Sequence, residues 1–208
     1  MSDFFSVLVV ALPAVFFVVD PFAVVPIFLT ITAGDPESKV RRMALRACVV
    51  GAGILIFFAL FGGFVFQILG VTLGAFRVAG GILLLITSLD MLRAQRSPTR
   101  TSPQEELEGT SKQDVAIVPL AMPLLAGPGS IATVMVLMSK GKGPLSALAV
   151  LISIVLTFVA SYFVLRAAAL VQRVLKASGV AILERLMGLI LAAIAVQFIA
   201  DGGRDLMR

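Results

Sequence analysis

A carboxylate in the middle of an apolar segment is the residue of this chain best placed to do chemistry. Asp20 is followed by Pro21 in the run VFFVVDPFAVVPIFLTIT (residues 15–32). An ionisable group deep in a membrane span is costly unless it is paired or hydrated, and by default it marks a functional site. Asp20 could therefore carry a proton or contact a transported solute. The alternative is structural, since the carboxylate can cap a half-helix whose first residue is Pro21.

A second interruption, Gly127-Pro128-Gly129, lies in the apolar run PLAMPLLAGPGSIATVMVLM. Proline removes a backbone donor and obstructs the preceding turn, so both runs should be broken helices. The free N–H groups where a helix restarts attract an anion such as a substrate carboxylate, and the hydroxyl side chains that follow could add contacts. The alternative is a kink with tight glycine packing. The predicted substrate-binding residues of the two breaks are Asp20, Pro21, Gly127, Pro128, Gly129, Ser130 and Thr133.

Two arginines, Arg77 and Arg185, stand at matching places near the starts of two later apolar runs. An inward-facing guanidinium could pair with Asp20 or hold a substrate carboxylate. We favour snorkelling to the headgroups, because both arginines lie only a few residues into their helices. Two glycine pairs are expected to serve close helix packing: Gly62-Gly63 and Gly80-Gly81. Three aspartates at helix ends are expected to be interfacial charges: Asp90, Asp201 and Asp205.

The composition places these residues in a membrane protein. Of the 208 residues, 59% are hydrophobic and 14% are charged, and the mean hydropathy is +1.06. A soluble domain of this size cannot bury so much apolar surface. The net charge of +5 is spread over several short loops, so no nucleic-acid partner is expected. One cysteine and no histidine exclude an internal disulfide, histidine-based metal sites and serine–histidine catalysis, and we expect no metal, cofactor or enzyme activity.

Six apolar segments are long enough to cross a bilayer, which takes about 20 residues. The first and fourth contain the two breaks, and the first should form half-helices over 4–19 and 22–33. The polar segment 93–114 is the predicted linker between the halves 1–92 and 115–208. The six segments are 4–33, 44–69, 71–92, 115–139, 144–171 and 181–201.

The two halves resemble each other. The aspartate–proline pair at Asp20 corresponds to the first glycine and proline of the second break, and an R-x-x-G pattern at Arg77 recurs 108 positions later at Arg185. Because each half has three spans, an odd number, the second half must cross the membrane in the opposite sense. The predicted fold is an all-α membrane protein with six transmembrane helices in two inverted three-helix repeats, the first and fourth helices being broken near the midplane.

The basic residues predict the orientation, because cytoplasmic loops are enriched in Lys and Arg. We expect the linker 93–114 to be cytoplasmic and both termini to be periplasmic, in a multi-pass protein of the cell inner membrane. The first apolar run has no basic residue ahead of it and no small-residue cleavage pattern, so it should be a spanning helix rather than a removed signal. The richer side carries Lys39, Arg41, Arg42, Arg46, Arg93, Arg96, Arg100, Lys112, Arg173 and Lys176; the other carries Lys140, Lys142, Arg204 and Arg208.

With these motifs in hand, the chain closely resembles the MarC family of bacterial inner-membrane proteins. The resembling stretches are FFVVDPFAVVPIFLTIT (16–32), FRVAGGILLLITSLDML (76–92) and AMPLLAGPGSIATVM (121–135). In that family the first motif usually reads DP-x-G-x-x-P, whereas Ala23 stands here where glycine is common. The resemblance implies a six-helix integral membrane protein, and one branch of the family is regarded as transporting glycine and alanine. The family is distantly similar to lysine-exporter and thiol-reductant carriers, but a thiol carrier needs paired cysteines.

The resulting hypothesis is a secondary transporter of small neutral amino acids, with proton coupling through Asp20 as a further hypothesis. The solute carboxylate would lie near Gly129 and Ser130, and its ammonium group would face the first break. The expected partners are this solute and the lipid bilayer, and the oligomeric state stays open. A transporter of another small metabolite or ion is the main alternative. A membrane enzyme is disfavoured because Ser130 has no base, and a scaffold is disfavoured because it needs no irregular backbone at membrane depth.

Overall fold

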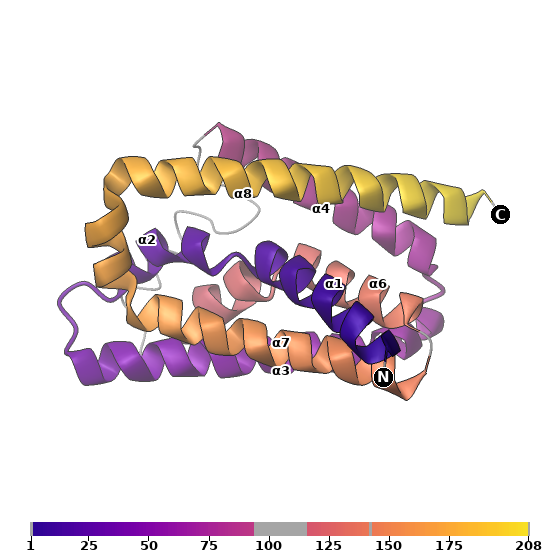
Figure 1. Ribbon diagram of the computed structural model, residues 1–208, viewed down its shortest axis with the longest axis horizontal. Coiled ribbons are helices and arrows are strands. Elements are labelled where there is room, and N and C mark those ends of the chain that lie inside the picture. The colour runs from indigo at the N-terminus through magenta and orange to yellow at the C-terminus, as the bar shows by residue number, and fades with distance from the viewer. Residues whose placement is uncertain (1, 94–115, 142, 208) are drawn as a thin grey trace.

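The computed structural model describes residues 2–93, 116–141 and 143–207, and all regular secondary structure in these ranges is helical (Figure 1). The predicted all-helical class is therefore confirmed. The elements are α1 (Ser2–Val19), α2 (Pro21–Ile31), α3 (Glu37–Ile68), α4 (Leu73–Leu92), the π-helix η1 (Ala116–Leu125), α6 (Pro128–Lys140), α7 (Pro144–Arg166) and α8 (Ala168–Leu206).

Within the described ranges, five helical segments are long and apolar enough to cross a membrane. They overlap five of the six predicted spans, with ends that differ by several residues, and a helix of about 20 residues covers about 30 Å of hydrocarbon. The remaining predicted span, 115–139, is divided between η1 and α6, and residue 115 lies outside the described residues. The five segments are Phe4–Ile31, Glu37–Ile68, Leu73–Leu92, Pro144–Arg166 and Ala181–Leu206.

The predicted extension of the fifth span to residue 171 is wrong. The helix α7 ends at Arg166, the chain turns at Ala167, and α8 begins directly afterwards. Figure 1 shows the first turns of α8 crossing the bundle before the helix continues along the long axis. The corner lies among three consecutive alanines, without a proline or glycine to signal it. At 1.5 Å per residue, the 23 residues of α7 already cover about 35 Å, so a longer straight helix would leave the hydrocarbon.

The long helices form two layers, and the broken helices lie between them (Figure 1). In one layer α4 packs along α8, and in the other α3 packs on α7. The half-helix α1 contacts mainly α7, and its continuation α2 contacts both α8 and α7. Likewise η1 contacts α3, and α6 contacts both α3 and α4. Each broken helix therefore touches both layers, and each break is enclosed between them.

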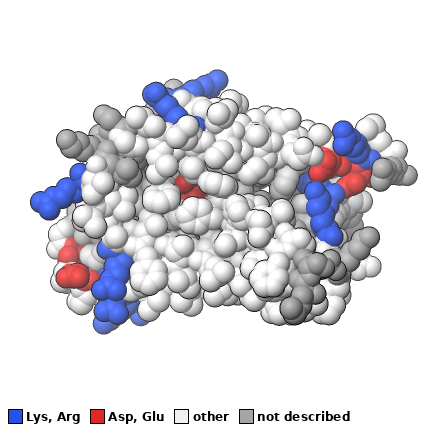
Figure 2. Space-filling view, in the orientation of Figure 1, with Lys and Arg blue, Asp and Glu red and all other residues white. Residues whose placement is uncertain are grey.

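Both termini lie at one end of the long axis, which we call the terminal end (Figure 1). At the opposite end α2 is followed by α3, whose first turns carry several basic residues. On the face seen in Figure 2, charged side chains gather mainly toward these two ends, and the middle is almost uncharged. This distribution matches a molecule whose long axis crosses a bilayer.

Glycine allows the helices to approach closely at the predicted places, with one exception. A Cβ atom on Gly81 would lie 2.8 Å from Ile199 Cγ1, so α4 and α8 are in backbone-level contact there. A Cβ atom on Gly63 would meet nothing within 4 Å, so the packing role predicted for this glycine is wrong. The prediction is confirmed for Gly62, Gly80 and Gly81.

Candidate functional site

The first break is built on Asp20, which lies between the end of α1 and the start of α2. Its backbone adopts φ 47° and ψ 66°, and it is the only residue other than glycine with positive φ in the described part of the chain. This conformation costs about 1–3 kcal/mol in an L-residue, and such strain concentrates at functional sites. The side chain is buried, and its Oδ1 accepts a hydrogen bond of 3.4 Å from the Ala23 N–H. The capping role predicted as the alternative is thus present, and it is compatible with a role in transport.

The second break has the same plan without the carboxylate. Gly127 occupies the N-cap position of α6 with an extended backbone, and Pro128 is the first helical residue, as Pro21 is in α2. No side chain caps the α6 N-terminus. The first turn of α6 therefore presents N–H groups and the positive end of a helix dipole, which favour an anion.

The segment before the second break is a π-helix, which the sequence reasoning did not predict. In η1 the hydrogen bonds span five residues, and the last of them joins the Ala126 N–H to the Ala121 carbonyl at 2.9 Å. Pro119 and Pro123 fall in this segment and supply no N–H group, which weakens a regular α-helical ladder. Two prolines four residues apart were the available signal. Segments of π-helix occur frequently at functional sites.

The two breaks meet at the hydroxyl group of Ser130. Its Oγ lies 3.4 Å from the carbonyl oxygen of Val18, near the end of α1, and 3.3 Å from that of Leu125, at the end of η1. Carbonyls at a helix end lack a partner within the helix, so this hydroxyl donates to a group left free by one break or the other. The sequence reasoning expected Thr133 beside the ligand as well, but in this structure its hydroxyl donates to the Gly129 carbonyl at 2.9 Å.

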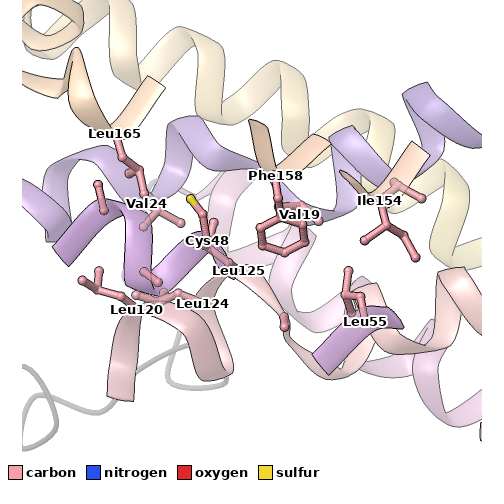
Figure 3. Packing of buried hydrophobic residues seen from close by; sticks show 14 of the residues in the cluster. Val19, Val24, Cys48, Leu55, Leu120, Leu124, Leu125, Ile154, Phe158 and Leu165 are labelled. Atoms are coloured by element: carbon pink, nitrogen blue, oxygen red, sulfur yellow. The ribbon is translucent and has the colours of Figure 1, made fainter. Parts of the chain in front are cut away.

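Close packing surrounds this junction on both sides. Gly129 faces α4, where an added Cβ atom would lie 2.3 Å from Leu84 Cδ2. On the other side Val19, Leu125 and the ring of Phe158 belong to one buried cluster (Figure 3). The junction is therefore held between the two helix layers, in a conformation that is closed around Ser130.

A second carboxylate, Glu184 of α8, accompanies Asp20. Both line a crevice between α2 and α8 that also includes Met187 and is too narrow to admit a water molecule. In Figure 2 a small acidic spot interrupts the uncharged middle of the molecule. The sequence reasoning missed Glu184, although an acidic residue inside the predicted span 181–201 was the signal that could have found it.

Arg77 and Arg185 have different environments, and that of Arg77 differs from the predicted snorkelling. Arg77 is buried, and its guanidinium group forms an ion pair with Asp205 of α8 and donates a 3.1 Å hydrogen bond to Ser139 Oγ of α6. It therefore faces neither the headgroups nor Asp20, and Asp205 is a structural partner rather than a free interfacial charge. Arg185 is exposed, as snorkelling requires. Asp201 also has partners at the terminal end, since Lys140 Nζ lies 3.3 Å from its Oδ2.

The arrangement offers a buried carboxylate, an uncapped helix N-terminus and a hydroxyl group between two interrupted helices. These groups suit binding of a small polar molecule by its two charged ends. Within residues 2–93, 116–141 and 143–207, no three His, Cys, Asp or Glu side chains gather as they would around a metal ion.

Comparison with known proteins shows similarity to one family of membrane proteins over nearly the whole chain. The model of the MarC family integral membrane proteins matches residues 5–207. The chain is 40% identical over 197 residues to a UPF0056 membrane protein of Methanocaldococcus jannaschii, covering 94% of this chain and 95% of the relative. It is 34% identical over 199 residues to the UPF0056 membrane protein YvbG of Bacillus subtilis, covering 95% and 94%. The corresponding values for YhcE of Escherichia coli are 29% over 187 residues, covering 90% and 87%. No solved structure matches the chain.

Proposed function

Because the chain belongs to the MarC family of integral membrane proteins, as its motifs predicted, we propose that it is a secondary transporter of small neutral amino acids. The transported solutes would be of the glycine and alanine type, and a proton bound at Asp20 would be the coupling ion. The observation that carries this proposal is the contact of Ser130 Oγ with the Val18 carbonyl, which joins two helix breaks between the packed layers. Broken helices that meet at a repeat interface are the usual construction of a transporter binding site.

The proposal includes six transmembrane helices in two inverted repeats, with η1 and α6 together forming the fourth span. In this arrangement α1–α2 corresponds to η1–α6, α3 to α7, and α4 to α8. An internal two-fold axis requires that the contact of α1 with α7 has a counterpart between η1 and α3, and that of α2 with α8 a counterpart between α6 and α4. Both counterparts occur, and they support the repeat.

The solute would replace the contact that now closes the junction. Its carboxylate would accept hydrogen bonds from the uncapped N-terminus of α6 near Gly129 and Ser130, and its ammonium group would lie toward Asp20. A short side chain is favoured because Leu84 and Phe158 leave little room beside the breaks.

The proposed topology puts the terminal end in the periplasm and the linker 93–114 in the cytoplasm of a cell with an inner membrane. Two observations support it. Both termini lie at the same end of the molecule (Figure 1), and the basic residues of the early α3 lie at the other end, where an anionic inner leaflet attracts them.

Flux of labelled alanine into proteoliposomes tests the function. The wild-type protein should accelerate both exchange and net uptake, whereas Asp20→Asn should abolish net uptake. Asp35→Asn is the control, because Asp35 is outside the breaks and pairs with Lys39 at 2.7 Å. Alanine entry no faster than in protein-free liposomes would contradict the proposal. Thermal stabilisation by other metabolites or ions alone would favour the alternative of a different solute.

A further inference from the structure

A groove opens between α3, α4 and α6 on the terminal side of the junction. Its volume is about 470 Å³, which lies in the range of small-molecule pockets. Phe66 and Gln67 of α3, Leu73 of α4, and Met135, Met138 and Ser139 of α6 are among the residues that line it. None of these belongs to the candidate site described above.

The groove follows the part of α6 that leads from the junction to the terminal end. With a rise of 1.5 Å per residue, Met135 lies about 7.5 Å from Ser130 along the helix and Ser139 lies about 13.5 Å from it. The groove therefore runs along the last turns of α6, between the junction and the terminal end.

Met135 is the groove-lining residue of α6 that lies nearest the junction along the helix. This side chain is buried and packs directly against Gly62 of α3, where an added Cβ atom would lie 2.6 Å from Met135 Cε. Methionine is unbranched and changes rotamer readily, so it can fill such a gap or leave it without movement of the backbone. Among the groove-lining side chains of α6, Met135 is therefore both the nearest to Ser130 along the helix and the most easily displaced.

Polar groups mark the outer part of the groove, although its walls are mostly apolar. Gln67 is exposed on α3, and on α6 the Ser139 hydroxyl accepts a hydrogen bond from the buried Arg77 and donates one to the Val136 carbonyl at 2.8 Å. Polar and charged side chains at membrane depth face protein or a water-filled cavity. The outer part of the groove therefore offers hydrogen-bonding partners to water or to a polar solute.

We propose that this groove is the entrance through which the solute reaches the junction from the terminal side, and that the contact of Met135 with Gly62 is part of the barrier between the groove and the junction. The inference rests on the proposed transport function and adds the path and the gate. In this structure the barrier is closed. Opening requires that the thioether leaves Gly62, so that a solute of small cross-section can pass toward Ser130.

Accessibility to a membrane-impermeant thiol reagent tests the entrance, and the single cysteine of the chain makes the test simple. In a Cys48→Ala background, Ala59→Cys places a thiol in the inner part of the groove, and Phe61→Cys places one on the exposed, lipid-facing side of the same helix at nearly the same depth. Reagent added from the terminal side should modify the cysteine at 59 several-fold faster than that at 61, and alanine should slow the reaction. Equal rates at the two positions, or a rate at 59 that no transported solute changes, would overturn the entrance.

The reactivity of a cysteine at position 130 tests the barrier separately. In the same background, Ser130→Cys should react slowly from the terminal side, several-fold faster when combined with Met135→Ala, and slowly again with Met135→Leu, which keeps the volume of the side chain. An unchanged rate with Met135→Ala in protein that still unfolds cooperatively would overturn the gate. Failure of the proposed function gives a different result: alanine flux is then absent, while the cysteine at 59 still reacts faster than that at 61 and Met135→Ala still exposes the cysteine at 130.

Discussion

The hydroxyl oxygen of Ser130 lies 3.4 Å from the main-chain carbonyl of Val18, 112 residues earlier in the chain. This single contact joins the start of α6 to the end of α1 and so connects the two interrupted helices. Ser130 Oγ is also 3.3 Å from the Leu125 carbonyl, so the same hydroxyl can donate a hydrogen bond to the last turn of α1 or to that of η1. A small rotation of this side chain would exchange one acceptor for the other.

Replacing Ser130 with alanine should weaken the junction. Loss of a buried hydrogen bond costs about 1 kcal/mol of unfolding free energy, so the unfolding temperature of the detergent-solubilised protein should fall slightly while alanine flux falls strongly. The matched control is Ser153→Ala, which removes a buried hydroxyl that bonds only to Ala149 within α7. A Ser130→Ala protein with unchanged flux would remove this hydroxyl from the site.

Three substitutions at Asp20 separate its backbone role from its charge. Asparagine tolerates positive φ and retains a capping oxygen, so Asp20→Asn should fold with nearly unchanged stability and lose net uptake. Asp20→Gly keeps the positive φ without strain but lacks the capping oxygen. Asp20→Ala lacks the capping oxygen and also disfavours positive φ, so it should be the least stable variant, by about 1–2 kcal/mol relative to wild type. Thermal unfolding and alanine flux measured on the same preparations check this order. Full net uptake by Asp20→Asn would show that only the geometry matters.

Gly129→Ala should destabilise the protein because the new methyl group would lie 2.3 Å from Leu84 Cδ2. Crowding of this kind typically costs about 1–3 kcal/mol. Combining it with Leu84→Ala should restore part of the loss, so the two changes should couple favourably in a double-mutant cycle of unfolding free energies. Gly63→Ala is the control, since nothing lies within 4 Å of its added methyl group and alanine favours a helix interior. Additive effects at Gly129 and Leu84 would mean that the clash is relieved elsewhere.

Arg77 and Arg185 should respond very differently to the same substitution. Arg77→Ala leaves Asp205 without its partner and opens the contact of α4 with α6 and α8, so we expect a clear drop in the unfolding temperature. Arg185→Ala removes an exposed side chain and should change the unfolding free energy by less than about 0.5 kcal/mol. Differential scanning fluorimetry of both variants makes the comparison. Equal effects would contradict the structural role of Arg77.

Much of the fold follows from local rules and could be read from the sequence. The two breaks were predicted because proline removes an N–H group wherever it stands. Capping by Asp20 was the structural alternative to a role in transport, because the residue before a helix-starting proline occupies the N-cap position. Five of the six predicted spans overlap long apolar helices, because the thickness of the hydrocarbon sets the length of an apolar helix, although some of their ends were misplaced. The corner at Ala167 was missed because alanine favours a helix and carries no local signal for a turn.

The sequence by itself thus determined the membrane class, the positions of the breaks and the capping of α2, since each depends on neighbouring residues or on the apolar length of one segment. Only the tertiary structure decided that Ser130 reaches Val18, that Glu184 and Asp20 line one crevice, that Arg77 pairs with Asp205, and that Met135 packs against Gly62. These contacts join helices that are far apart in the chain, and they depend on the rotation and depth at which each helix packs. Apolar side chains fix those two quantities collectively, so no single motif encodes them.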